Sequence, residues 1–296
     1  MTTSGLVIVD KPPVWTSHDV VARIRKLAGT RRVGHAGTLD PMATGVLIVG
    51  VEKATRLLGH LALTEKEYSG TIRLGQTTTS DDADGDITQR APVKNVSDDR
   101  IRSAMDELTG DIEQIPPGVS AIKVDGQRSY RLARAGATPE LSARPVTVSE
   151  FAAEAIRPQG DLIDVDVRVR CSSGTYIRAL ARDLGTALGV GGHLTALRRT
   201  RVGPYDIGQA RTLEQLAEQL ELLPLAQAAA AAFPRRELTA EEAQLIGHGG
   251  KLPALGTGEK PVAAFDPDGS LVALLTEADG QARSLAVFAA QARAAG

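Results

Sequence analysis

The chain has 296 residues, of which 42% are hydrophobic and 24% charged, as is usual for a globular protein with one substantial domain and a smaller one. Its single cysteine, Cys171, excludes an internal disulfide and a cysteine metal cluster, and it is consistent with a reducing compartment. The first apolar run is too short for a signal peptide and no later run approaches a membrane span, so we expect a cytoplasmic protein without a membrane anchor.

The net charge of −2 hides an uneven distribution along the chain. Residues 1–60 contain eight Lys/Arg and four Asp/Glu, and residues 151–210 contain eight and six. Residues 61–110 and 211–296 are net negative, with six against ten and seven against eleven. Local potential, rather than the total charge, attracts a polyanion. A nucleic acid therefore stays a candidate partner despite the acidic total.

Strands and helices are interspersed irregularly along the first two thirds of the chain. Residues 5–9 predict a strand, and Ser17 predicts the N-cap of a helix that ends before Gly29. The same patterns predict a strand over 46–51, a helix over 54–61, a strand over 66–74 and a helix from Ser97 to about residue 108.

The second half contains a long alternating segment and then changes character. Residues 163–171 alternate apolar and polar side chains, which is typical of an antiparallel sheet, and the class is therefore α+β. An alanine-rich stretch between Pro224 and Pro234 leads into a small β-rich unit. We therefore expect domains at residues 1–233 and 234–296.

The most unusual segment is GHAGTLDPMATGVL, residues 34–47. Pro41 restricts Asp40 to an extended conformation, and Gly37 and Gly45 permit sharp turns, so the carboxylate lies on a stiffened loop of the kind that a nucleophile requires. Taken alone, an Asp-Pro pair is more often a simple turn, and a lone histidine such as His35 is more often a packed or surface group. Both interpretations stay open at this point.

Other chemistries lack their sequence signals. The five histidines have no His-x-x-x-His spacing, and the chain has no P-loop, no strand-linked GxGxxG and no GxSxG. The sequence therefore favours carboxylate chemistry without a metal or an organic cofactor.

Two further segments contain candidate residues. In CSSGTYIRALARDLG, Arg178 follows a strand closely enough for its guanidinium to point back to the sheet, and Tyr176 shares its face if the helix begins after Thr175. In KEYSGTIRLG, Tyr68 could stack on one base, although aromatics make up only 3% of the chain, which argues against a multi-ring platform. An ordinary helix-surface arginine and a core tyrosine are the alternatives. The basic stretches 123–134 and 197–201 could bind phosphates or be solvated faces.

In this order the segments resemble the bacterial TruB family, the tRNA pseudouridine-55 synthases. The resemblance covers roughly residues 5–203 and rests on six blocks: DKPPVWTSHDVV, GHAGTLDPMATGVL, KEYSGTIRLG, PPGVSAIKVDGQRSYRLARAG, CSSGTYIRALARDLG and HLTALRRTRVG. It implies a pseudouridine-synthase catalytic domain with a mixed, mainly antiparallel sheet, an RNA-gripping insertion at 116–145 and a PUA-like C-terminal domain. It also implies a tRNA T-arm as the substrate, no cofactor, a monomer, and an additional role in RNA folding.

The resemblance assigns roles to seven residues. Asp40 is the nucleophile, attacking C6 of the base or C1′ of the sugar or promoting a glycal route, and the guanidinium of Arg178 favours the ionised carboxylate. Tyr68 stacks on the flipped uridine and is a candidate for proton abstraction. The remaining four are expected to bind the substrate or support the active-site loop: His35, Tyr176, Leu197 and Lys11.

Two positions depart from the family pattern, and two other functions compete with the one implied. The family usually has Gly at Val14 and Tyr at Val119, and both bear on the shape of the pocket. The competing functions are a non-catalytic RNA-binding protein and a nucleoside hydrolase or glycosylase. Product analysis distinguishes them, because the products are unchanged RNA, free uracil or the isomer.

Overall fold

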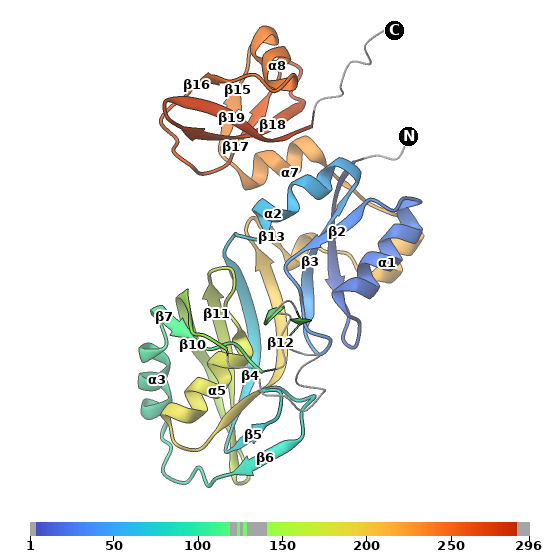
Figure 1. The fold of residues 1–296 in the computed structure, drawn as a ribbon. Helices are drawn as coiled ribbons and strands as arrows, with labels where there is room; N and C mark the ends of the chain where they lie inside the picture. The colour runs from blue at the N-terminus through green and yellow to red at the C-terminus, as the bar shows by residue number, and fades with distance from the viewer. Residues whose placement is uncertain (1–3, 119–122, 125–126, 129–140, 289–296) are drawn as a thin grey trace.

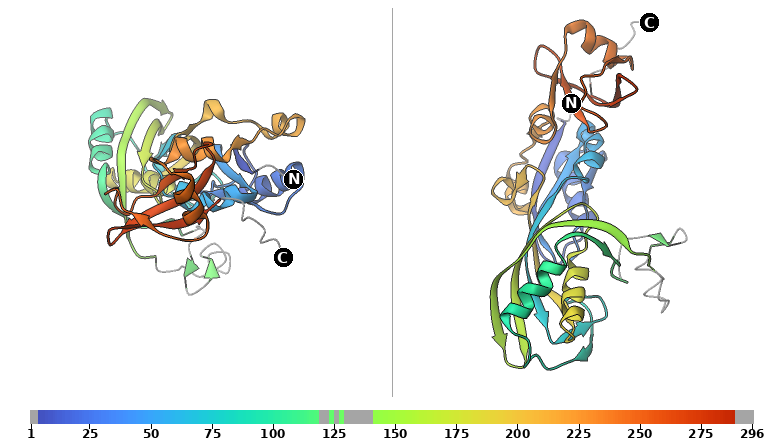
Figure 2. Two further views of the ribbon diagram at one scale, coloured as in Figure 1. Left: turned by 90° about the horizontal axis from the view of Figure 1, so that it is seen from above. Right: turned by 90° about the vertical axis from the view of Figure 1, so that its left-hand side faces the viewer.

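The structure is a computed structural model that describes residues 4–118, 123–124, 127–128 and 141–288 (Figure 1). It consists of a large sheet with helices around it and a smaller C-terminal sheet that lies at one end, so that the molecule is elongated (Figure 2). Among the described residues, no helix is long and apolar enough to cross a membrane.

The large sheet has ten strands in the order β14-β1-β3-β12-β4-β11-β10-β7, with β13 beside β12 and β2 beside β3. All of its pairs are antiparallel except β3 with β12, which are parallel. Its strands are β1 (Gly5–Lys11), β2 (Val33–Ala36), β3 (Thr44–Val51), β4 (Lys66–Leu74), β7 (Gly110–Gln114), β10 (Arg144–Gln159), β11 (Leu162–Cys171), β12 (Gly192–Val202), β13 (Tyr205–Asp206) and β14 (Leu223–Pro224). Two short pairs lie outside it: β5 (Gln76–Thr78) with β6 (Ile87–Arg90), and β8 (Lys123–Val124) with β9 (Gln127–Arg128).

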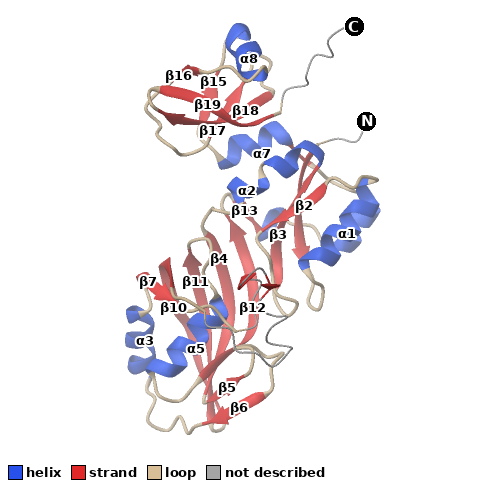
Figure 3. Ribbon diagram, in the orientation of Figure 1, coloured by secondary structure: helices blue, strands red, loops and turns tan. Residues whose placement is uncertain are grey.

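Helices lie along one face of this sheet, and two others cover the opposite face at its N-terminal end (Figure 3). The α-helices are α1 (Ser17–Ala28), α2 (Leu58–Leu61), α3 (Asp98–Glu107), α5 (Ile177–Ala187), α6 (Leu213–Glu218) and α7 (Leu225–Ala232), and the 3₁₀ helices are η1 (Glu52–Arg56) and η2 (Ile207–Gln209). α3 packs on β10, α5 packs on β12 and β4, and α1 packs on β2 and β3.

The C-terminal sheet has five strands in the order β15-β17-β18-β19-β16. They are β15 (Arg235–Glu237), β16 (Leu252–Pro253), β17 (Val262–Phe265), β18 (Leu271–Ala278) and β19 (Gln281–Val287), and α8 (Ala240–Gly247) packs on β18 and β19. The observed architecture confirms the α+β class with a mixed, mainly antiparallel sheet and a β-rich C-terminal unit.

Two cores hold β3 from opposite sides. Leu47 and Val49 belong to the core shared with α1, α5 and α3, because alternate side chains of a strand point to opposite faces. Val46 and Ile48 belong to a second core, which includes α2, α7 and Phe265 of β17. The strand that follows the Asp40 loop is therefore buried on both faces.

Two predicted elements need correction. The N-cap of α1 is Thr16 rather than Ser17, because Thr16 forms a capping box with Asp19. The Ser17 hydroxyl instead accepts from Leu39 N at 2.9 Å and donates to Leu39 O at 3.2 Å. The helix predicted over 54–61 is a 3₁₀ turn, η1, followed by the short α2. Val119 and most of the insertion predicted at 116–145 lie outside the described residues.

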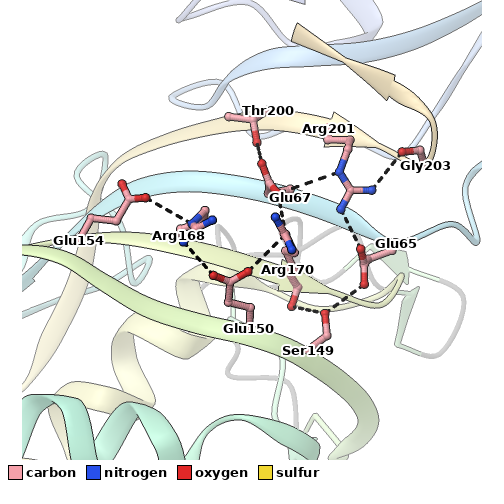
Figure 4. Close-up of polar contacts among 10 residues, drawn as sticks. All are labelled: Glu65, Glu67, Ser149, Glu150, Glu154, Arg168, Arg170, Thr200, Arg201 and Gly203. Carbon is pink, nitrogen blue, oxygen red and sulfur yellow. Dashed lines mark hydrogen bonds and ion pairs between the residues drawn. The ribbon is translucent and has the colours of Figure 1, made fainter.

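The other face of the large sheet carries an ion-pair network that joins four adjacent strands, β10, β11, β4 and β12 (Figure 4). We call it the open-face network, and its charged members are Glu65, Glu67, Glu150, Glu154, Arg168, Arg170 and Arg201. Most of these side chains are partly exposed to solvent, and each arginine contacts two glutamates.

Candidate active site

Asp40 lies in a loop between β2 and β3 that is fixed at both ends. The loop starts at Gly37, whose φ of 80° is a left-handed conformation that favours glycine. Leu39 is buried and bonded to Ser17 at the start of α1, and Ala43 N donates to Asp40 O at 3.1 Å. The carboxylate therefore projects from a turn that is anchored to a helix and to a buried strand.

A buried guanidinium bridges Asp40 to a second carboxylate. Arg178, at the second position of α5, places Nε 3.0 Å from Asp40 Oδ2 and Nη1 3.3 Å from Asp82 Oδ2. Its Nη1 also donates to Ser80 O at 2.9 Å. The Asp40 side chain is 38% exposed, whereas those of Arg178 and Asp82 are each 6% exposed. Arg178 is thus held from behind by Asp82 and faces Asp40, which solvent can reach.

Asp40 faces a cavity of about 290 Å³ between the sheet and the start of α5. This volume lies just below the usual range for ligand sites, about 300–1,000 Å³, so the cavity suits a small, flat ligand. Five of the seven residues assigned from the resemblance line it: Asp40, Tyr68, Tyr176, Arg178 and Leu197.

Tyr68 and Leu197 line the cavity from neighbouring strands, β4 and β12. Tyr68 is buried, and burial raises the pKa of its hydroxyl despite the nearby Arg199 guanidinium. The phenol therefore stays protonated at neutral pH and can act as a ring surface without ionising.

Tyr176 is fixed through its backbone at the N-terminus of α5. Its N–H donates to Gln114 Oε1 at 2.7 Å, and its carbonyl accepts from Gln114 Nε2 at 3.1 Å. Because α5 begins at Ile177, after Thr175, both Tyr176 and Arg178 reach the cavity.

Lys11 lies beneath the loop that contains Asp40 rather than in the cavity lining. Its ammonium donates to Pro12 O at 2.9 Å, Trp15 O at 2.7 Å and Pro41 O at 3.2 Å. Burial, partly opposed by the charge of Asp40, lowers the pKa of Lys11 to about 8. The side chain joins the β1–α1 loop to the Asp40 loop.

His35 is also outside the cavity lining. It lies on β2 opposite Val49 of β3, and its ring meets that of His18 edge to face, with 5.7 Å between the centroids. Burial, followed by the charges of His18 and Arg199, lowers the pKa of His35. The ring is therefore neutral at physiological pH.

Sequence reasoning missed three charged residues at the site: Asp82, Lys66 and Arg199. Arg199 is fully buried, and it donates to Val46 O at 2.7 Å, Gly37 O at 3.0 Å and Thr38 O at 3.4 Å. Lys66 donates to two backbone carbonyls, those of Ala62 at 2.8 Å and Thr64 at 2.9 Å.

Within the described part of the chain, neither Lys66 nor Arg199 forms an ion pair with a carboxylate. Burial, and then the charge of Arg199, lowers the pKa of Lys66 to about 8. Strand alternation in LRRTR would have placed Arg199 on the same face as Leu197, but the run of charges was interpreted as a solvated or phosphate-binding surface. Asp82 stands among several acidic residues in residues 81–86 and had no distinguishing signal.

Across the described residues, no group of three or more His, Cys, Asp or Glu side chains is arranged to hold a metal ion. What the cavity offers is one accessible carboxylate, a guanidinium beside it, and aromatic and aliphatic walls. This arrangement suits nucleophilic attack on a flat ring held against Tyr68 and Leu197.

Comparisons with known proteins identify the family of the chain. The profile of the TruB family pseudouridylate synthase N-terminal domain matches residues 25–177, that of the tRNA pseudouridylate synthase B C-terminal domain matches 178–228, and that of the tRNA pseudouridine synthase II C-terminus matches 233–289.

The relatives match over nearly the whole chain. A tRNA pseudouridine synthase B from Thermobifida fusca is 61% identical over 96% of this chain and 98% of its own length, and one from Mycobacterium bovis is 54% identical over 97% and 96%. A solved structure of an H/ACA RNP bound to a substrate RNA containing 2′-deoxyuridine includes a chain that is 28% identical, with a TM-score of 0.73 over 97% of this chain and 86% of that one. The chain therefore belongs to the TruB family of pseudouridylate synthases.

Proposed function

We propose that the protein converts the uridine at position 55 in the T-arm loop of tRNA to pseudouridine, with Asp40 as the nucleophile and with no metal or organic cofactor. The observation that carries the proposal is the Asp40 carboxylate, which faces a base-sized cavity while Arg178 contacts it from the buried side at 3.0 Å. A guanidinium in this position favours the ionised, nucleophilic carboxylate.

The reaction moves the base without a net loss of atoms. The N1–C1′ bond of the uridine breaks, the uracil turns and a C5–C1′ bond forms, after which C5 loses a proton and N1 gains one. Asp40 attacks C6 of the base or C1′ of the sugar, or it promotes a glycal route. Tyr68 is a candidate acceptor of the C5 proton, but that step needs its phenolate form, which the raised pKa disfavours, so we propose a stacking role for Tyr68 first.

The uridine must leave the RNA loop to reach Asp40, which costs a few kcal/mol of lost stacking. We propose that Tyr68, Tyr176 and Leu197 replace part of that loss, because all three line the cavity. Lys11 is buried and supports the Asp40 loop through Pro41 O, and the partly exposed His35 is a candidate for contact with the RNA. A role in tRNA folding is consistent with binding the T-arm loop.

We further propose that residues 1–233 form the catalytic domain and that 234–296 form a PUA-like RNA-binding domain. The five-stranded sheet that begins at Arg235 supports this division.

A tritium-release assay tests the proposal. The full-length protein is incubated with a T-arm hairpin tritiated at uridine C5, and released tritium and modified nucleosides are measured. We expect the wild-type protein to release tritium and form pseudouridine, and Asp40→Asn to bind the hairpin without turnover, because the amide has a similar shape but is not a nucleophile. Asp86→Asn is the matched control at an exposed aspartate outside the cavity lining. Turnover by Asp40→Asn, or release of free uracil, would exclude the proposed mechanism.

A further inference from the structure

The loop between β1 and α1 presents the only tryptophan of the chain beside the Asp40 loop. Trp15 is 38% exposed, and among the described Phe, Tyr and Trp residues it is the only one with an exposed side chain. Isolated apolar side chains on a surface need no explanation, but an exposed aromatic ring on a loop bonded to the loop of a proposed nucleophile is a candidate for a binding contact.

The backbone of Trp15 is held in place. Its carbonyl accepts from Lys11 Nζ at 2.7 Å, and the same ammonium donates to Pro41 O at 3.2 Å. The next residue, Thr16, forms the capping box of α1. Trp15 therefore lies between a capped helix and the residue that follows Asp40, and little backbone freedom is left to lose on binding.

Val14, the residue before Trp15, has a strained backbone conformation although its side chain is not buried. Val14 has a φ of 72°, a left-handed conformation that is rare for a β-branched residue, and its side chain is 83% exposed. Its N–H donates to Pro41 O at 2.8 Å, which joins the tip of the loop to the Asp40 loop. Strain that brings no packing is a common property of functional sites. Pro13, Val14, Trp15 and Pro41 are all exposed, and they stand on two loops that the hydrogen bond from Val14 to Pro41 joins.

We propose that Trp15 stacks on an unpaired base of the RNA loop next to the uridine that enters the cavity. The proposal rests on the proposed function, and it adds a contact outside the cavity. When a base is flipped out, its neighbour loses a stacking partner, and an exposed aromatic ring on a fixed backbone beside the Asp40 loop can replace that partner. Stacking is tolerant of base identity, so the contact contributes affinity more than sequence choice.

The position of the ring favours an RNA base over a protein partner. Lys11 joins Trp15 to Pro41, and Pro41 follows the proposed nucleophile directly. A protein that covered Trp15 would lie beside the Asp40 loop and compete with the substrate. A single base in the RNA loop covers the ring while its neighbour occupies the cavity.

Because the chain has one tryptophan, its emission reports on this ring alone. The full-length protein is titrated with a T-arm hairpin, and the emission and its quenching by iodide are recorded. We expect the hairpin to quench the emission and to protect the ring from iodide. A duplex of the stem without the loop provides phosphates but no unpaired bases, and it should leave the emission unchanged.

Substitutions provide the second measurement. We expect Trp15→Ala to weaken hairpin binding about tenfold, while Trp15→Phe keeps most of the affinity because it keeps a ring. Leu245→Ala on α8, another exposed apolar side chain far from the cavity, is the control and should bind like the wild type. Because these side chains are exposed and the backbone contacts of Trp15 are kept, we expect every variant to fold. Thermal unfolding of each variant verifies this.

The outcomes separate this inference from the proposed function. If the wild type forms pseudouridine but the hairpin leaves the emission unchanged and Trp15→Ala binds normally, the stacking contact is wrong and the proposed function stands. If the wild type forms no pseudouridine, the proposed function fails, whatever the emission shows. An equal loss of affinity in Trp15→Ala and Trp15→Phe would also overturn stacking, because the ring would then contribute nothing.

Discussion

The two faces of the large sheet use the same kinds of charged side chain in opposite ways. Lys66 and Glu67 are neighbours on β4, yet Lys66 lines the cavity and Glu67 belongs to the open-face network (Figure 4). On the open face, each charge is close to opposite charges and most are partly in solvent. At the cavity, buried cations outnumber the carboxylates and are held largely by backbone carbonyls. Pairing on a surface contributes little and unpaired burial is costly, so the charges at the cavity are the ones that function maintains.

The largest expected effect is on the cavity side, at Arg178. Arg178→Lys keeps the charge but loses the planar group that contacts Asp40, Asp82 and Ser80 O together. We expect the single-turnover rate of pseudouridine formation to fall about 100-fold, as misplacement of a reacting group commonly does, with hairpin affinity little changed.

Arg170→Lys is the matched control, because Arg170 bridges Glu67 and Glu150 on the open face. It should turn over at the wild-type rate. If Arg178→Lys and Arg170→Lys had the same rate, the different arrangement of charges on the two faces of the sheet would have no effect on catalysis.

The next effect concerns pH and Lys66. Its pKa of about 8 in the folded protein is below the ordinary 10.5, so between these values the unfolded chain binds a proton that the folded protein does not. Stability therefore rises as pH increases through this window, by about 3 kcal/mol for the full shift. We expect Lys66→Met to remove that rise, measured as the difference from wild type in the free energy of unfolding by urea at about pH 8 and about pH 10.

Glu67→Gln on the opposite face should behave differently. Burial alone would raise the pKa of Glu67, but its hydrogen bonds with Arg170 and Thr200 more than offset this, and its pKa is lowered. Its stabilising contribution is present above the ordinary pKa and is lost as pH falls through the folded value. Glu67→Gln should therefore change the free energy of unfolding only at acidic pH. A change at alkaline pH would contradict this assignment.

A smaller effect is expected at Val14. Val14→Gly removes a strained φ of 72° from an exposed position, while glycine makes the unfolded chain more flexible. We expect a net gain of about 1 kcal/mol in the free energy of unfolding, and a smaller gain for Val14→Ala, which keeps a Cβ. A loss of similar size in Val14→Gly would mean that the exposed valine side chain makes stabilising contacts.

The smallest effect is expected within the open-face network. Arg168→Gln leaves Glu150 paired with Arg170 and frees the half-exposed Glu154. We expect a loss of less than about 1 kcal/mol in the free energy of unfolding, which shrinks further as salt is added. Urea unfolding at low and high salt measures it, and a loss above about 2 kcal/mol would show that this network is a major source of stability.

Periodicity predicted the strands more accurately than the polar details of the site. The strand predicted over 66–74 coincides with β4, and the α+β class is confirmed. The N-cap of α1 was misplaced by one residue because Thr16 and Ser17 are both good caps, and only the tertiary contact of Ser17 with Leu39 separates them.

The missed residues depend on contacts between distant segments. Asp82 and Arg178 are far apart in the sequence, and nothing local shows that they meet. Arg199 stands in a basic run that is usually solvated, and only the pairing of β12 between β3 and β4 places it under the Asp40 loop. The roles of Asp40, Tyr68 and Arg178 were assigned through the resemblance, because spacing alone left the ordinary alternatives open.

The double burial of β3 links the far end of the molecule to the reaction. One of the two hydrophobic clusters that pack on this strand includes α7 and Phe265. The residue that follows β19 is also bonded to η1, because Lys53 Nζ donates to Phe288 O at 2.7 Å. A shortened protein that ended before β15 would leave part of that cluster open to water. Such a truncation would loosen the support of the loop ahead of β3, so a catalytic defect in it would not by itself identify the removed segment as an RNA-binding unit.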